Sequence, residues 1–78
     1  MQCFFVQIKT KLGRAYDVAD TLAQREIASE IHSTSGEYDL LAKFYLEDED
    51  DIGHFVNERL HDIEGIELTF TTLTFKAF

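Results

Sequence analysis

Hydrophobic and polar positions along this chain change several times between a spacing of two and a helical spacing. Phe4, Val6 and Ile8 alternate with other side chains, which predicts a strand with one apolar face. Val18 and Leu22 recur at the spacing of an amphipathic helix. The complete prediction is a strand over 3–9, a helix over 14–24, strands over 27–34 and 40–46, a helix from 48 or 49 to about 62, and a strand over 66–75.

The order of these elements, β-α-β-β-α-β, restricts the fold. The connection at Ser35–Tyr38 is short, so the strands on either side of it form an antiparallel hairpin. Gly65 is expected to end the second helix, whose core-facing stripe is Ile52, Phe55, Val56, Leu60 and Ile63. Right-handed crossovers then predict an α+β, ferredoxin-like sandwich with a four-stranded antiparallel sheet and both helices on one face.

The sheet face without helices is also expected to be apolar. Phe5 lies opposite Phe4 and Val6, and Leu41 and Tyr45 fall on this second face. A face exposed to water would be more polar. With 78 residues, one cysteine and no proline, the chain forms a single domain over 1–78 near the lower limit for a stable core. We therefore expect a homodimer that packs through the open sheet face.

Charge and composition exclude several classes of function. Fifteen acidic residues against seven basic ones give a net charge of −8, which disfavours direct nucleic-acid binding. The first apolar run is too short to cross a bilayer and follows no basic segment, so no membrane association is expected. The lone Cys3 fits a cytoplasmic protein and a small apolar strand residue.

The turn Ser35-Gly36-Glu37-Tyr38-Asp39-Leu40 carries the chemistry most suggestive of ligand binding. Glycine gives the backbone a shape that exposes amide N–H groups, which are donors for a carboxylate. Asp39 adds an acceptor for an ammonium group. Together these groups meet the needs of a free amino acid. The alternative is a tight hairpin in which Asp39 only hydrogen-bonds nearby backbone.

Three other constellations favour plainer interpretations. Glu47–Asp51 does not fit a calcium loop, because Ile52 and Arg59 occupy positions that need oxygen ligands, so an acidic helix start is expected. His54, Glu58 and His61 are expected on one exposed helical face. Lys43 and Tyr45 lack any accompanying nucleophile. No metal, cofactor or catalytic residue is predicted.

The chain resembles the effector-binding (RAM) module of the Lrp/AsnC, or feast/famine, transcription regulators over essentially its whole length. The resemblance rests on the turn at 35–40, on Ile63-Glu64-Gly65-Ile66 followed by Thr69-Phe70-Thr71, and on the helix at 55–60. Glu64 stands where the family usually has proline. Nothing precedes Met1 here, whereas full-length members carry an N-terminal helix-turn-helix domain, so a stand-alone form is expected.

The resemblance implies a non-catalytic module that senses a small effector, typically an amino acid, and assembles into a ring of dimers. It would modulate transcription indirectly, by co-assembly with a DNA-binding homologue. The implied ligand contacts are Ser35, Gly36, Glu37, Tyr38, Asp39, Thr69 and Thr71. Alternatives with the same element order are a small dimeric α/β-barrel enzyme resembling cofactor-free oxygenases and an ACT-like regulatory domain.

Overall fold

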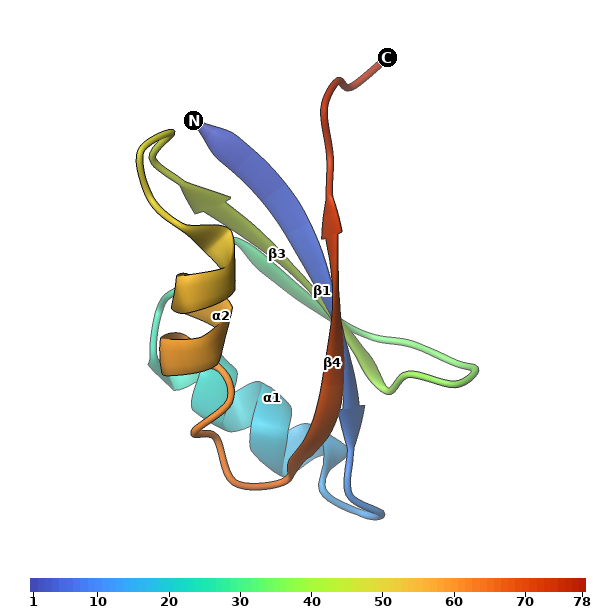
Figure 1. Ribbon diagram of the computed structural model, residues 1–78. Coiled ribbons are helices and arrows are strands. Elements are labelled where there is room, and N and C mark those ends of the chain that lie inside the picture. The colour runs from blue at the N-terminus through green and yellow to red at the C-terminus, as the bar shows by residue number, and fades with distance from the viewer.

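The computed structural model describes all 78 residues and contains the six elements in the predicted order (Figure 1). They are β1 (Gln2–Thr10), α1 (Ala15–Gln24), β2 (Glu30–Ser33), β3 (Leu40–Leu46), α2 (Ile52–Arg59) and β4 (Ile66–Leu73). The strands form one antiparallel sheet in the order β2-β3-β1-β4. Both helices lie on the same side of this sheet, which confirms the ferredoxin-like α+β prediction (Figure 1).

The face of the sheet beneath the helices forms the core. Phe4, Val6 and Ile8 are completely buried, and so are Ala42 and Phe44 of the neighbouring strand. The rings of Phe4 and Phe44 stack at 5.3 Å between centroids. The rest of the core cluster comes from the helices, the segment after α2 and the start of β3: Val18, Leu22, Val56, Leu60, Ile63 and Leu40. The space between sheet and helices is therefore filled by apolar side chains.

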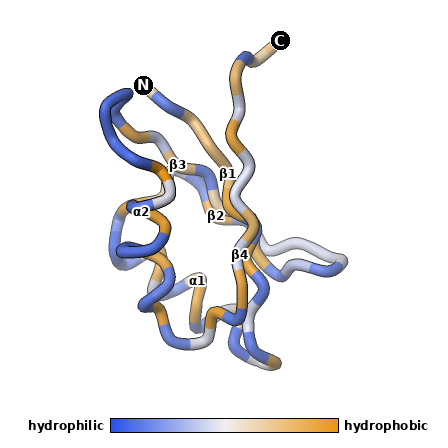
Figure 2. Tube along the Cα trace, in the orientation of Figure 1, coloured by the Kyte–Doolittle hydropathy of each residue, from blue (hydrophilic) through white to orange (hydrophobic).

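The opposite face has no cover within the chain. The β1–β3 and β1–β4 registers place Phe5 beside Lys43 and Thr72, and Gln7 beside Leu41 and Phe70. This open face also carries two partly exposed side chains, Tyr45 at 45% and Leu68 at 47% exposure. Apolar residues recur along the strands of this sheet (Figure 2).

The second strand and the last strand are shorter than predicted. β2 contains only Glu30–Ser33, because Ile27 and Ala28 pack against the core as part of the connection from α1. This connection contains Glu26 with a φ of 55°, a turn conformation that interrupts a strand. β4 ends at Leu73, two residues before the predicted end.

The predicted boundaries of α2 were wrong at both ends. Asp51, rather than Asp48 or Glu49, is the N-cap, and its Oδ1 accepts a hydrogen bond of 3.0 Å from the backbone N–H of His54. The helix ends at Arg59. Gly65 therefore does not terminate it but lies in the following loop with a φ of 100°. A Cβ at this position would lie 2.9 Å from Val18 Cγ2, so glycine allows the loop to pack closely on α1.

No helix in the structure is long and apolar enough to cross a membrane.

Candidate functional site

The turn between β2 and β3 projects from the end of the sheet and is closed by two hydrogen bonds (Figure 1). Thr34 donates its backbone N–H to the carbonyl of Asp39 at 2.9 Å and its hydroxyl to the carbonyl of Tyr38 at 2.9 Å. Gly36 has a φ of 97° and no atom near the place of a Cβ. Glycine is therefore favoured at this position by the positive φ of the backbone and not by close packing.

The turn presents unused hydrogen-bond donors. None of the backbone N–H groups of Ser35, Gly36, Glu37 and Tyr38 donates a hydrogen bond within the chain. Ser35, Gly36 and Glu37 are exposed to solvent. Successive free backbone amides are donors that suit an anionic group. This is the donor set that the sequence predicted for a carboxylate.

Asp39 fixes the turn to the end of β1. Its Oδ2 accepts hydrogen bonds from the backbone N–H of Thr10 at 2.8 Å and from the Thr10 hydroxyl at 3.1 Å. Its own N–H donates to the carbonyl of Ile8 at 2.9 Å. The Thr10 backbone donor, supported by the Thr10 hydroxyl and the charge of Lys9, holds the pKa of the Asp39 carboxyl below its ordinary value against the opposing effect of burial. The carboxylate thus stays charged beside the free amides, and Oδ1 makes no hydrogen bond.

Two further contacts hold the turn against the rest of the sheet. Lys9 Nζ donates to the carbonyl of Glu37 at 3.3 Å. The Tyr38 ring lies 6.4 Å from the ring of Phe70 on β4, between centroids. Because Phe70 belongs to the open face, this ring contact joins the base of the turn to that face.

A shallow hollow of about 280 Å³ lies beside Asp39. It is lined by Lys9, Thr10, Lys11, Leu12, Gly13, Ala15, Asp39 and Glu67. Lys9, Lys11 and Glu67 were not predicted as site residues. The sequence does show the loose basic group that contains the two lysines, but their position beside Asp39 depends on the β1–β3 and β1–β4 registers. Two ammonium groups and two carboxylates suit a zwitterionic ligand better than a singly charged one.

The structure does not bring Thr69 and Thr71 together with the turn in one chain. Their β1 partners are Ile8 and Val6, so both threonines point to the helix-covered side of β4. The Thr69 hydroxyl lies 2.9 Å from His61 Nε2. The turn contacts the other side of β4, through Phe70. A ligand that touches both sets of residues would need groups from more than one subunit.

The sequence predicted that His54, Glu58 and His61 share one helical face, but in the structure they do not. His54 Nε2 and Glu58 Oε1 form an ion pair of 3.2 Å, whereas His61 lies beyond the end of α2 and contacts Asn57 and Thr69. The early end of the helix at Arg59 is the reason for this difference.

Lys43 and Tyr45 both lie on the open face. Lys43 Nζ lies 5.3 Å from the centroid of the Tyr45 ring and 3.5 Å from Glu30 Oε2.

The βαββαβ fold places the chain in the class of small ferredoxin-like α+β modules. The comparisons with known proteins make the family explicit. Residues 3–78 match the family model described as "Lrp/AsnC ligand binding domain". The chain therefore belongs to the Lrp/AsnC ligand-binding domain family, as its sequence motifs predicted.

Individual relatives agree with this assignment. The chain is similar to the HTH-type transcriptional regulator FL11 of Pyrococcus furiosus, with 31% identity over 73 residues that cover 94% of this chain and 48% of the relative. The chain thus spans about half the length of the curated relatives it matches. It also resembles the crystal structure of TTHA0845 from Thermus thermophilus, with a TM-score of 0.88, 31% identity, and coverage of 100% of this chain and 98% of the other. The crystal structure of the hypothetical protein PHS023 from Pyrococcus horikoshii gives a TM-score of 0.84 at 25% identity, with coverage of 99% and 93%.

Proposed function

We propose that this protein is a non-catalytic sensor of a free amino acid, and that the effector binds at the turn between β2 and β3. The observation that carries the proposal is the set of four free backbone amides at Ser35–Tyr38 next to a charged Asp39. The amides suit the α-carboxylate of an amino acid, and the free Oδ1 of Asp39 suits its ammonium group. Thr69 and Thr71 complete the proposed contacts from a neighbouring subunit.

Assembly is the second part of the proposal. The open face combines aromatic and aliphatic side chains that a monomer leaves exposed, and burying them against a second copy stabilises a homodimer. Dimers would assemble further into a ring, so that the turn of one dimer lies near β4 of the next. An effector that binds more tightly to one assembly state shifts the equilibrium toward that state.

The link to transcription follows from the relatives. The curated relatives are named HTH-type transcriptional regulators, and this chain covers about half of their length. Through shared open faces it would co-assemble with a DNA-binding homologue and modulate transcription indirectly. The packed interior between sheet and helices gives no support to an oxygenase-like enzyme, which would need a polar pocket there.

The test is calorimetry of the folded protein with each of the twenty amino acids, combined with light scattering in their presence and absence. At least one amino acid should bind and change the assembly size. Binding should be lost in Asp39→Ala, because its carboxylate is the proposed ammonium acceptor. If no amino acid binds to the folded wild-type protein, the sensing proposal is wrong.

A matched variant separates ligand binding from the structural role of Asp39. Thr10→Val removes the hydroxyl that donates to Asp39 Oδ2 but keeps the carboxylate and the backbone donor. This variant should retain effector binding. If it loses binding as completely as Asp39→Ala does, Asp39 acts by holding the turn in place rather than by contacting the effector.

A further inference from the structure

Three polar side chains in contact link the end of α2 to β4. Asn57 Oδ1 lies 3.1 Å from His61 Nδ1, and His61 Nε2 lies 2.9 Å from the Thr69 hydroxyl. Thr69 belongs to β4, the edge strand of the sheet. Although the imidazole is exposed, both of its ring nitrogens are therefore engaged. These contacts end on a proposed effector contact, so their chemistry bears on the candidate site.

The partner at each end fixes which nitrogen of the neutral imidazole carries the proton. The amide oxygen of Asn57 can only accept a hydrogen bond, so Nδ1 of His61 is the donor. A neutral imidazole has one N–H, so Nε2 is an acceptor. The Thr69 hydroxyl then donates its only hydrogen to Nε2. With neutral His61, Thr69 can accept a hydrogen bond from a ligand but cannot donate one.

Protonation of His61 reverses the role of Thr69. Both nitrogens of an imidazolium are donors, so Nε2–H donates to the Thr69 oxygen and the hydroxyl hydrogen is released. Thr69 can then donate to a carboxylate or a carbonyl of a ligand. Histidine is the side chain that ordinarily changes its charge between about pH 5 and pH 8, and His61 is open to solvent. One proton therefore converts an acceptor into a donor and places a positive charge beside it.

A hollow of about 410 Å³ lies beside the His61–Thr69 pair. It is lined by His61, Ile66, Glu67, Leu68 and Thr69. The Glu67 carboxylate forms no ion pair or hydrogen bond with any other group of the chain, unlike the nearby carboxylates of Asp62 and Glu64. An unpaired carboxylate attracts a cation and repels a second carboxylate. The hollow thus offers two acceptors, the Glu67 carboxylate and the Thr69 oxygen, to a group that carries N–H donors.

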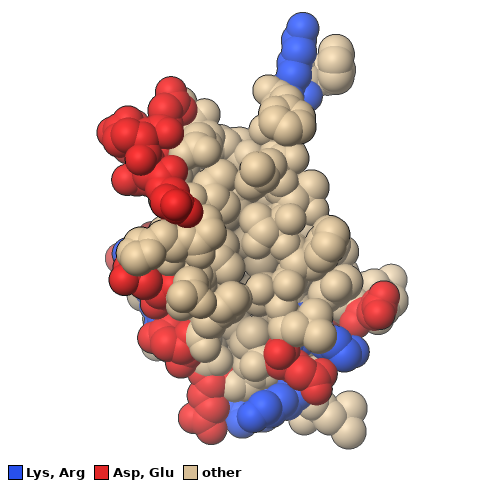
Figure 3. Space-filling model, viewed as in Figure 1, with Lys and Arg blue, Asp and Glu red and all other residues tan.

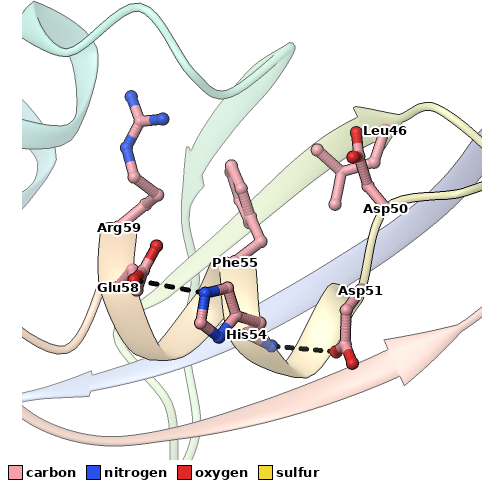
Figure 4. Close-up of a pocket in the computed structure, with 7 residues that line it drawn as sticks. All are labelled: Leu46, Asp50, Asp51, His54, Phe55, Glu58 and Arg59. Atoms are coloured by element: carbon pink, nitrogen blue, oxygen red, sulfur yellow. Dashed lines mark hydrogen bonds and ion pairs between the residues drawn. The ribbon is translucent and has the colours of Figure 1, made fainter.

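The other charged groups around His61 have contacts of their own. Three carboxylates form ion pairs: Glu58 with His54, Asp62 with Arg25 of α1, and Glu64 with Arg14. The first pair, at 3.2 Å, is drawn in Figure 4. The Arg59 guanidinium lies over an aromatic ring of α2. Lys9 and Lys11 border a second hollow that Glu67 also lines, but neither forms an ion pair with it. Acidic side chains gather over α2 (Figure 3), so the surrounding potential adds to the preference for a cation.

We infer that His61 is a positioning residue that makes Thr69 an acceptor, so that the effector is an amino acid whose side chain ends in N–H donors. Binding is tighter where that group is an ammonium. The turn of one subunit holds the α-carboxylate and the α-ammonium, which leaves the side chain to reach the hollow at Thr69 of the next subunit. Glu67 and the committed Thr69 hydrogen exclude an acidic side chain. The inference rests on the proposed function, because it takes Thr69 as an effector contact, and it adds the class of effector and a dependence on pH.

The first measurement needs no effector. Long-range proton–nitrogen NMR spectra of the histidine rings at about pH 8 distinguish a neutral ring protonated on Nδ1 from one protonated on Nε2. His61 should carry its proton on Nδ1. In Asn57→Leu, which lacks the acceptor, this preference should be lost, whereas His54→Gln should leave it unchanged. A neutral His61 with its proton on Nε2 overturns the inference, because Nε2 would then donate to Thr69.

The second measurement is calorimetry with all twenty amino acids and with matched pairs at about pH 8. The pairs are lysine with norleucine, glutamine with glutamate, and asparagine with aspartate. In the pair that contains the effector, the member with N–H donors should bind at least about fivefold more tightly, because its partner leaves the acceptors unsatisfied. In His61→Leu the Thr69 hydroxyl is free to donate, so the preference for an amide over its acid should shrink. Thr69→Ser keeps the hydroxyl and should keep the preference.

The third measurement is the pH dependence of effector binding. Lowering the pH from about 8 to about 5.5 enters the range in which histidine gains its proton, so effector affinity should fall about threefold or more. Asp39 stays charged over this range, because its carboxyl has a lowered pKa. Asn57→Asp places a carboxylate beside Nδ1 and favours the imidazolium, so the fall should begin at a higher pH. His61→Leu should abolish the fall, and His54→Gln should leave it unchanged.

The outcomes separate this inference from the proposed function. If the amino acid that binds most tightly has no side-chain N–H donor, the inferred effector class is wrong and the sensor remains. If His61→Leu keeps both the selectivity and the pH dependence of the wild type, the role of His61 is wrong and the sensor again remains. If no amino acid binds to the folded protein, the effector class is overturned together with the sensing function.

Discussion

The two faces of the sheet use the same strands for different purposes. On the helix-covered face, Phe4 and Phe44 are completely buried and stack on each other. On the open face, Phe70 is 55% exposed and its ring approaches only Tyr38 of the projecting turn. Aromatic side chains on both faces give nearly continuous apolar strands, yet only one face is used to fold a single chain. The second face is then available for assembly, and its aromatic residues touch the candidate effector site.

The largest expected effect comes from removing an aromatic ring on the covered face. Phe44→Ala leaves a cavity beneath the helices and should destabilise the monomer by about 3–5 kcal/mol. Phe70→Ala on the open face should change monomer stability by less than about 1 kcal/mol and should weaken the dimer instead. Chemical unfolding at low protein concentration, together with sedimentation, measures both effects. Equal losses of monomer stability would mean that the two faces do not divide folding from assembly.

A smaller effect is expected from substituting two glycines with similar backbone angles, one in the loop that packs on α1 and one in the turn between β2 and β3. Gly65 and Gly36 have φ values of 100° and 97°, so alanine is strained at either position. Only at Gly65 would the new Cβ also collide with a core side chain, at 2.9 Å from Val18 Cγ2. Gly65→Ala should therefore cost about 2–4 kcal/mol and Gly36→Ala about 1–2 kcal/mol.

Thermal unfolding of the two glycine variants measures this difference. The reverse order of stability would show that the turn, rather than the loop on α1, is the more constrained of the two segments.

Much of the fold could be predicted from the sequence, because the apolar residues of the strands and of α1 recur with clear periodicity. Phe4, Val6 and Ile8 were correctly assigned to the core by their spacing of two. The limits of β2 could not be predicted, since apolar Ile27 and Ala28 give the same signal in a packed connection as in a strand. The N-cap of α2 was also ambiguous, because every residue from 47 to 51 is acidic and only the folded backbone selects Asp51.

The candidate site was only partly accessible to sequence reasoning. The amides of the turn and the charge of Asp39 follow from local residues. The hydrogen bonds that Thr10 donates to Asp39 do not, because they join positions 29 residues apart and depend on strand register. Thr69 and Thr71 were implied as ligand contacts by the family resemblance rather than by local residues, and within one chain the alternation of β4 places Thr69 and Phe70 on opposite faces of the sheet.

The smallest predicted effect is a pH dependence of stability, and it arises from Asp39 in the turn rather than from the core. The folded pKa of Asp39 lies below its unfolded value of about 3.9, so the carboxylate stabilises the fold at neutral pH. This stabilisation is lost as pH falls below about 4 and through the lowered pKa. Asp39→Asn still offers a carbonyl acceptor to Thr10 but carries no charge. The difference in melting temperature between wild type and Asp39→Asn should therefore be largest near pH 6 and shrink below pH 4.

Thr10→Val sharpens this last comparison, because it removes the weaker of the two donors and keeps the backbone N–H bond of 2.8 Å. Its difference from wild type should be smaller than that of Asp39→Asn and should decline over the same acid range. Other carboxylates with lowered pKa, those of Glu30 and Asp62, titrate in all three proteins and cancel in the differences. A difference for Asp39→Asn that stays constant from pH 6 to pH 3 would mean that the Asp39 charge contributes nothing to the fold. In that case the fold would not depend on the Asp39 charge, and the carboxylate could bind a ligand without any change in the stability of the turn.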